Sequence, residues 1–296
     1  MRIILKSPYS TISQIQTFFE SKGIRAQKKF GQNFLIDQNI VDYIVNIAKP
    51  LFTEPEITLA EIGIGLGTLT YPILSLQKET DLFEIDFAYI QLAKEEILPK
   101  FPNAHLYAGD ALENLFHIFP KRVFVFGNLP YHLTTEIIST LLIHCRMFQG
   151  GIFMVQKEFA ERLAKETSSL SVFLSAFCDV KYLKTVHKNC FFPIPKIHSA
   201  LILLTPKSEK SKNHWSPQSE EEVAIWSRML RTLFWGKRKQ IQVSLRESPF
   251  SDDPKFREAL AEAISLSAIP PTKRPEELNQ EQFLNLGQHL LDILSK

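Results

Sequence analysis

From residue 57 to residue 205, short apolar runs alternate with amphipathic stretches that carry apolar residues at helical spacing. Buried strands that alternate with helices in this way form a parallel sheet with crossover helices. Only the proline-rich segment 191–196 separates the last two runs, which indicates a final antiparallel hairpin. The predicted strands are 57–63, 81–86, 104–110, 123–129, 152–156, 180–186 and 199–205, and the predicted helices are 68–76, 87–98, 134–147, 158–165 and 169–178.

Two further regions flank this α/β pattern. Before it, the pattern predicts helices over 11–20 and 38–49, joined by a segment, 27–37, that mixes cations, amides and aromatic rings. We interpret this segment as an ordered loop over a ligand site, and a solvated linker is the alternative. After the α/β pattern come a polar stretch at 207–219 and helical stretches at 220–234, 239–246, 254–266 and 275–294. We therefore expect an α/β domain with a parallel sheet over 1–206 and a small all-helical domain over 207–296.

Composition and charge narrow the class of protein. The chain has 296 residues, of which 45% are hydrophobic, as in an ordinary globular protein. The net charge of +2 gives no general attraction to nucleic acid, although residues 1–49 hold seven cations against three acids. The three cysteines have no metal-like spacing, and no apolar run is long enough to cross a membrane. We expect a cytoplasmic protein without a metal.

A glycine-rich turn follows the first predicted strand. Gly63, Gly65 and Gly67 alternate with apolar residues, so the backbone can turn sharply and approach a ligand without obstruction by a Cβ atom. Dinucleotide enzymes use a similar turn with the spacing G-x-G-x-x-G. Here the spacing is G-x-G-x-G, and the carboxylate of Glu61 just before the turn would repel a pyrophosphate.

Acidic residues stand at the ends of the next two strands. Glu84 and Asp86 follow Gly63 at the distance of a carboxylate that binds ribose hydroxyls. Asp110 ends the third strand and can accept a hydrogen bond from an adenine amino group. NAD and S-adenosylmethionine share adenosine, so the glycine turn and the first acidic strand end fit both. Glu61, Glu84 and Asp110 give three acidic strand ends, and no cation is placed to bind a phosphate. This pattern favours S-adenosylmethionine over NAD.

The fourth strand leads into Gly127-Asn128-Leu129-Pro130-Tyr131, and a helix follows. An exocyclic amine is a poor nucleophile until hydrogen-bond acceptors hold its hydrogens and redirect its lone pair. The side-chain oxygen of Asn128 and the carbonyls that flank Pro130 can be those acceptors, while the ring of Tyr131 can stack on a base. The alternative is a turn in which Asn128 and Pro130 only shape the backbone.

Together these motifs resemble the KsgA family of ribosomal RNA adenine dimethyltransferases. The matching stretches are 28–35, 61–70, 84–86, 109–112, 127–131, 153–163 and 191–201, in the family's order. The resemblance implies a Rossmann-like sheet that binds S-adenosylmethionine. The residues implied for this donor are Asn33, Leu35, Gly63, Gly65, Glu84, Asp110 and Asn128, and those implied for the target adenine are Asn128, Pro130 and Tyr131.

The family's reaction is the transfer of two methyl groups to N6 of each of two adjacent adenosines. These lie in a hairpin loop near the 3′ end of the small-subunit (16S) rRNA, so the resemblance implies this rRNA, or an assembling 30S subunit, as partner of a monomeric enzyme. We expect RNA phosphates to contact two basic clusters, although the second could simply favour a helix C-terminus. The clusters are Lys28 with Lys29, and Lys237 with Arg238 and Lys239.

Three other functions compete with this interpretation. A related class methylates large-subunit rRNA and confers macrolide resistance, but Leu129, Tyr131 and the long C-terminal region argue against it. A non-catalytic RNA-binding assembly or transcription factor on the same scaffold would have lost the Asn-Leu-Pro-Tyr motif or Asp110, and both are intact. An NAD-dependent oxidoreductase would need a turn that cradles phosphates, which Glu61 and the glycine spacing disfavour.

Overall fold

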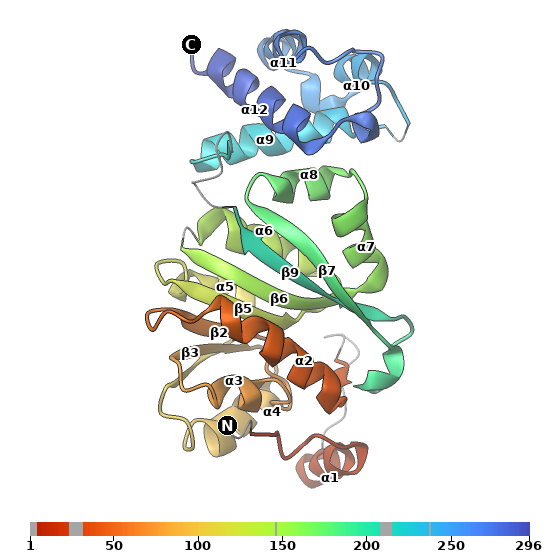
Figure 1. Ribbon diagram of the computed structural model, residues 1–296. Helices are drawn as coiled ribbons and strands as arrows, with labels where there is room; N and C mark the ends of the chain where they lie inside the picture. Colours follow the sequence, from red (N-terminus) through yellow and green to blue (C-terminus); the bar gives the residue numbers. More distant parts are fainter. Residues whose placement is uncertain (1–4, 24–31, 146, 208–214, 237) are drawn as a thin grey trace. The chain divides into compact units, whose positions relative to one another are not determined.

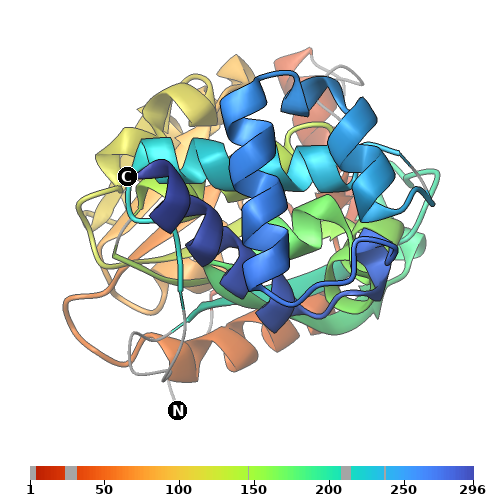
Figure 2. The ribbon, with the colours of Figure 1, turned by 90° about the horizontal axis from the view of Figure 1, so that it is seen from above.

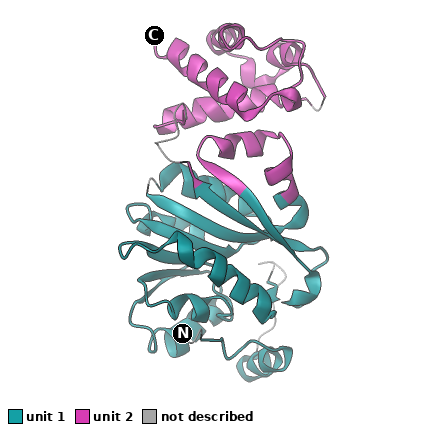
Figure 3. Cartoon of the chain, viewed as in Figure 1, with its two compact units in different colours: residues 1–160, 181–205 teal, residues 161–180, 206–296 magenta. Residues whose placement is uncertain are grey.

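The computed structural model describes residues 5–23, 32–145, 147–207, 215–236 and 238–296 (Figure 1). The chain divides into two compact units, which Figure 3 colours separately. The first unit holds Met1–Ala160 and Lys181–Thr205, and the second holds Glu161–Val180 and Pro206–Lys296. The division into independently folding domains at residue 206 stays a prediction.

One sheet of seven strands dominates the described part of the chain, in the order β4-β3-β2-β5-β6-β9-β7. Neighbours from β4 to β6 pair in parallel, whereas β9 runs antiparallel to β6. The predicted α/β fold is therefore confirmed. The strands are β2 (Thr58–Ile62), β3 (Thr80–Glu84), β4 (Ala104–Ala108), β5 (Val123–Asn128), β6 (Phe148–Gln156), β7 (Cys178–Val186) and β9 (Ser199–Pro206). A separate short pair joins β1 (Phe34–Leu35) to β8 (Phe191–Phe192).

Helices cover both faces of the sheet in the first unit (Figure 1). On one face α2 packs Ile40 and Ile44 against Phe124 of β5 in a shared apolar cluster. On the same face α3 contributes Tyr71 to a cluster with Leu82 of β3, since Leu82 and Phe126 of the first cluster both pair with Glu61. On the opposite face the ring of His117, which ends a 3₁₀ turn at Leu115–His117, stacks on Tyr107 of β4. The helices that begin in this unit are α1 (Ile12–Lys22), α2 (Gln38–Ala48), α3 (Thr70–Leu74), α4 (Phe87–Leu92), α5 (Ala111–Asn114), α6 (Thr134–His144) and α7 (Lys157–Lys165).

Capping residues set the ends of these helices. Asp37 accepts hydrogen bonds from the N–H groups of Asn39 and Ile40, so α2 begins where the sequence predicts. The predicted helix 87–98 is α4 followed by a π-helical turn at Ala93–Ile97. The predicted helix 68–76 is shorter, because the glycine turn continues through residue 69 and α3 begins only at Thr70.

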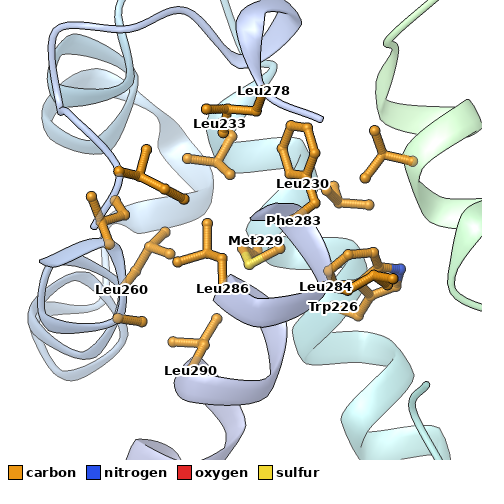
Figure 4. Packing of buried hydrophobic residues seen from close by; sticks show 14 of the residues in the cluster. Trp226, Met229, Leu230, Leu233, Leu260, Leu278, Phe283, Leu284, Leu286 and Leu290 are labelled. Carbon is orange, nitrogen blue, oxygen red and sulfur yellow. The ribbon is translucent and has the colours of Figure 1, made fainter. Parts of the chain in front are cut away.

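The second unit is helical and has its own apolar core. Figure 2 shows its long helices, and α11 packs against α12. Trp226, Met229 and Leu230 of α9 meet Phe283 and Leu286 of α12 in this core (Figure 4). Val172 and Ala176 share it, which explains why α8 belongs to this unit. The helices are α8 (Ser169–Ser175), α9 (Glu220–Leu233), α10 (Ile241–Glu247), α11 (Pro254–Leu266) and α12 (Gln280–Leu294).

The last helix begins later than the pattern 275–294 predicts. A 3₁₀ turn covers Pro275–Glu277, and α12 starts only at Gln280. Asn279 and Gln282 form a capping box there, which satisfies two backbone N–H groups at the helix start. No helix in the described residues is both long and apolar enough to span a membrane.

The packing of α12 against two tryptophan rings gives a stability test. A Cβ atom added at Gly287 would lie 2.7 Å from Cζ3 of Trp226 and 2.8 Å from the ring of Trp215. We expect Gly287→Ala to destabilise the protein by about 1–3 kcal/mol, because both rings would have to move. Denaturant unfolding of the full chain measures this change. Asn285→Ala, at an exposed position of the same helix, is the control and should change stability little; equal stability of both variants would contradict the close packing.

Candidate active site

A cavity of about 180 Å³ lies at the carboxyl edge of the sheet. From β2 the chain builds the sheet outward through β3 and β4, and β5 then returns to the other side of β2. Open α/β sheets bind ligands at such a reversal of strand order. All nine residues that the sequence implicated in donor or adenine binding line this cavity: Asn33, Leu35, Gly63, Gly65, Glu84, Asp110, Asn128, Pro130 and Tyr131.

The glycine turn forms one wall of the cavity. Gly63 and Gly65 both have positive φ angles, of 78° and 51°, which residues with a Cβ atom rarely adopt. At Gly65 a Cβ atom would also lie 3.2 Å from the ring of Phe34. The N–H of Gly63 donates to the carbonyl of Phe83 at 2.9 Å, so the turn is tied to the end of β3.

Glu84 is the residue that fixes this turn. Its Oε2 accepts the N–H of Gly65 at 2.9 Å, and its Oε1 accepts the N–H groups of Ile85 and Asp86, each at 2.8 Å. The side chain is 7% exposed, and its burial raises the pKa of the carboxyl group, while the three N–H donors act in the opposite direction. A carboxylate has about four lone-pair positions, so capacity remains for a ligand donor.

Gln32 is a cavity residue that the sequence analysis did not single out. Its Nε2 donates to Oδ2 of Asp86 at 2.8 Å, and its Oε1 accepts the hydroxyl of Tyr89 at 3.4 Å. Oδ1 of Asp86 meanwhile caps α4 at the N–H of Ala88. The described part of segment 27–37 therefore borders the cavity, as the sequence predicts. Gln32 lies inside the stretch 28–35, which resembles the KsgA family, and this position could have marked it as a cavity residue.

Asp110 stands at the end of β4, next to Gly109. Its Oδ1 accepts the N–H of Leu112 at 2.9 Å and so caps the short helix α5. Its backbone carbonyl accepts the side-chain amide of Asn114 at 2.8 Å. The carboxylate is half-buried and lines the cavity, where it can accept a hydrogen bond from a ligand amine.

Asn128 ends β5, and its side chain is oriented by the backbone. Its Nδ2 donates to the carbonyl of Asn33 at 3.0 Å, which leaves the side-chain oxygen as the acceptor. The carbonyl of Pro130 accepts two donors, the N–H of Leu133 and the hydroxyl of Thr134, each at 3.0 Å. Both lone pairs of that carbonyl are therefore in use, so the Leu129 carbonyl is the better candidate of the two that flank Pro130.

Tyr131 lines the cavity and is held by its hydroxyl group. The hydroxyl lies 3.0 Å from Oγ of Ser199, the first residue of β9, which is 1% exposed. A half-buried ring is thus anchored to a strand on the other side of β6. Ser199 belongs to stretch 191–201, which resembles the KsgA family, but its contact with Tyr131 could not be read from the sequence.

The residues expected to bind RNA are only partly described. Lys28, Lys29 and Lys237 lie outside the described residues. Arg238 is exposed and has a φ angle of 67°. Nζ of Lys239 lies 2.8 Å from Glu247 and 4.1 Å from the centre of the Trp235 ring, so this cation already has two partners in the second unit.

The fold and the cavity define an S-adenosylmethionine-dependent methyltransferase: a glycine turn, two carboxylates and an asparagine meet at the carboxyl edge of a Rossmann-like sheet. Within this class, a family model described as "Ribosomal RNA adenine dimethylase" matches residues 23–283. The chain belongs to this family.

Individual proteins agree with this assignment. The chain is 36% identical over 272 residues to "Ribosomal RNA small subunit methyltransferase A" of Buchnera aphidicola, covering 89% of this chain and 92% of that protein. It is 34% identical over 275 residues to the protein of the same name from Clostridium botulinum, covering 90% and 94%. Among solved structures, a dimethyladenosine transferase from Plasmodium falciparum aligns with a TM-score of 0.68 and 26% identity, covering 84% of this chain and 94% of that one.

The residues of the cavity fit S-adenosylmethionine. Glu84 and Asp110 supply acceptors for hydroxyl and amino groups, and the turn at Gly63 leaves open space where a Cβ would stand. Oε2 of Glu61, which also lines the cavity, is buried and has no hydrogen-bond partner among the described residues. An acidic, partly unsatisfied cavity suits a ligand that carries positive charge. No three His, Cys, Asp or Glu side chains of the described residues are grouped as metal ligands.

Replacement of Asp110 tests the donor site. We expect Asp110→Ala to weaken S-adenosylmethionine binding about tenfold or more, because an unpaired polar group of a bound ligand costs roughly 1–3 kcal/mol. Isothermal titration calorimetry measures the affinity. Glu113→Ala, an exposed acid on α5 that does not line the cavity, controls for the change in charge. If the two variants bound the donor equally well, Asp110 would have no part in the site.

Proposed function

We propose that this chain transfers methyl groups from S-adenosylmethionine to N6 of two adjacent adenosines. The target is a hairpin loop near the 3′ end of 16S rRNA, methylated during assembly of the small ribosomal subunit. One observation carries the proposal: Asn128, Leu129, Pro130 and Tyr131 line the same cavity as Glu84 and Asp110. The similar proteins from Buchnera aphidicola and Clostridium botulinum support the choice of small-subunit rRNA, because both are named "Ribosomal RNA small subunit methyltransferase A".

The asparagine motif activates the target amine. The lone pair of the adenine N6 amine is delocalised into the ring, so it must be redirected before it can attack. We assign the two acceptors of its hydrogens to the side-chain oxygen of Asn128 and the carbonyl of Leu129. The contact of Asn128 Nδ2 with the carbonyl of Asn33 keeps that oxygen in place for the amine.

Positioning supplies most of the rate enhancement in this proposal. S-adenosylmethionine supplies an activated methyl group on a positively charged sulfur. Alignment of two bound reactants can contribute ~7–11 kcal/mol, so a strong general base is not needed. His132 lines the cavity but is exposed at the start of the turn into α6, and we assign it no proton transfer. Loop adenines are unpaired, which lowers the cost of moving one into the pocket.

The proposal extends to the partner and the setting. The partner is small-subunit rRNA, naked or in an assembling subunit, and its phosphates contact Lys28, Lys29, Lys237, Arg238 and Lys239. The local excess of cations near the N-terminus supports this surface, since the phosphate backbone supplies much of the affinity for RNA. In this proposal the enzyme works as a cytoplasmic monomer without a metal.

Mass-spectrometric mapping of rRNA adenines tests the function. Cells with and without this protein are compared, and two adjacent dimethylated adenosines should be present in 16S rRNA only when the protein is present. Cells that carry Asn128→Ala are the matched control and should lack the modification. Modified adenines in large-subunit rRNA would point to the related macrolide-resistance activity, and no difference in any rRNA would point to a non-catalytic assembly factor.

Replacements of Tyr131 separate stacking from anchoring. Tyr131→Ala should lose ~1–3 kcal/mol of base stacking, so methyl transfer falls while donor affinity is unchanged. Tyr131→Phe keeps the ring but removes the hydrogen bond with Ser199, worth about 0.5–1.5 kcal/mol, so its activity should lie between that of wild type and Tyr131→Ala. Single-turnover methylation and calorimetry measure the two quantities. Full activity of Tyr131→Ala would remove the stacking role.

The two described cations should differ in their effect on RNA binding. Arg238→Gln should shrink the slope of log affinity against log salt by roughly 0.7–0.9 for each phosphate that the side chain no longer neutralises. Lys239→Gln should change the slope less, because Glu247 and Trp235 already engage this cation. Filter binding to a small-subunit RNA hairpin over a salt series measures both slopes. A wild-type slope in both variants would exclude this cluster from the RNA surface.

A further inference from the structure

Glu61 is a buried acid in the cavity that the proposed methyl transfer does not use. It lies on β2, the central strand, with Leu82 of β3 and Phe126 of β5 as its register partners. Its side chain is 3% exposed, and it lines the cavity two residues before Gly63, where the glycine turn begins. It is therefore both shielded from solvent and open to a bound ligand.

The surroundings of Glu61 favour its neutral form when no ligand is bound. Oε2 has no hydrogen-bond partner among the described residues, and neither does the hydroxyl of nearby Thr70. Glu84, in contrast, accepts three backbone N–H groups that stabilise its charge. A buried carboxylate without partners is strongly disfavoured, and such a group usually stays protonated instead. Burial raises the pKa of both acids, but only Glu84 has backbone donors that stabilise its charge, so the neutral form is favoured more strongly at Glu61.

The donor can change this balance, because its methionyl end carries two positive groups, the sulfonium and the α-ammonium. A cation within a few ångströms of a buried carboxyl group favours ionisation. We propose that Glu61 is protonated in the unliganded protein and that binding of S-adenosylmethionine expels this proton to solvent. The carboxylate that is left forms an ion pair with the cationic methionyl end of the donor.

The other charged groups around Glu61 agree with this proton balance. Burial raises the pKa of Glu61 to about 8, and the negative charge of Glu84 adds to this rise. The hydroxyl of Thr70 lies near enough to oppose the rise, although it forms no hydrogen bond with Oε2. The β5 side offers only the apolar Phe126. The remaining titratable groups that line the cavity are Tyr89, Asp110, Tyr131 and His132, none of which is a permanent cation. Below pH 8 the free protein therefore holds a proton that the complex does not, so donor affinity should rise with pH.

Calorimetry in buffers of different ionisation enthalpy counts the protons released on binding. Below the pKa of the donor's own α-amino group, which lies near 8, we expect wild type to release close to one proton for each donor bound at pH 6 and pH 7. Its Kd should fall up to tenfold between these two pH values. Glu61→Gln mimics the neutral acid, so it should fold normally, release almost no proton, and show a Kd that is flat over this range.

Two comparisons keep the test specific. Glu79→Gln, at an exposed position of the loop before β3, should release the same number of protons as wild type. S-adenosylhomocysteine lacks the sulfonium, so proton release with this ligand identifies the ammonium as the partner, and its absence identifies the sulfonium. Donor binding by wild type without proton release, or undiminished release by Glu61→Gln, would overturn the proposal. Because both results include donor binding, they leave the proposed methyl transfer intact.

Discussion

The active site depends on how buried carboxylates are satisfied at the edge of a parallel sheet. Glu84 is buried at the end of β3, and its two oxygens accept three backbone N–H groups from the glycine turn and from residues 85 and 86. The bond from Gly65 ties the positive-φ turn to Glu84, and the turn brings Gly65 against Phe34. The glycine turn that lines the donor site, and Phe34 of the N-terminal segment that packs on it, therefore both depend on the Glu84 side chain.

A second buried acid, Glu61, stands two residues before Gly63, and its Oε2 has no backbone donor in the part of the chain that the structure describes. The cavity therefore holds one carboxyl group that the protein satisfies and one that it does not. A site with every polar group satisfied internally would offer little to a cationic donor, whereas an unpaired buried acid gains from ion pairing. On the other side of β2, Asn128 and Tyr131 are each held by one hydrogen bond, to Asn33 and Ser199. The carboxyl groups of Glu61 and Glu84 therefore suit the cationic methyl donor, and the Asn128 amide and Tyr131 ring suit the target adenine.

Much of this could be predicted from sequence. Apolar runs such as Val123–Phe126 have to be buried, and all four of these residues are 0% exposed in β5, so the strands could be identified along the chain from periodicity. Their order in the sheet did not follow from periodicity. The residues of the cavity stand at strand ends, and parallel strands bring those ends together. Periodicity could not predict the interactions between particular side chains. The contact of Ser199 with Tyr131 spans 68 positions of the chain, and the ion pair of Lys239 with Glu247 depends on how α10 follows Gly236; neither is visible in the hydrophobic pattern.

The most direct test of this account is the affinity of Glu84→Gln for S-adenosylmethionine, measured by isothermal titration calorimetry. A glutamine amide offers only one acceptor oxygen, and its NH₂ group would face a backbone N–H that Glu84 now accepts. The turn should lose its anchor, and donor affinity should fall at least tenfold while the second, helical unit stays folded. An affinity equal to wild type would contradict the central role of Glu84 in the donor site.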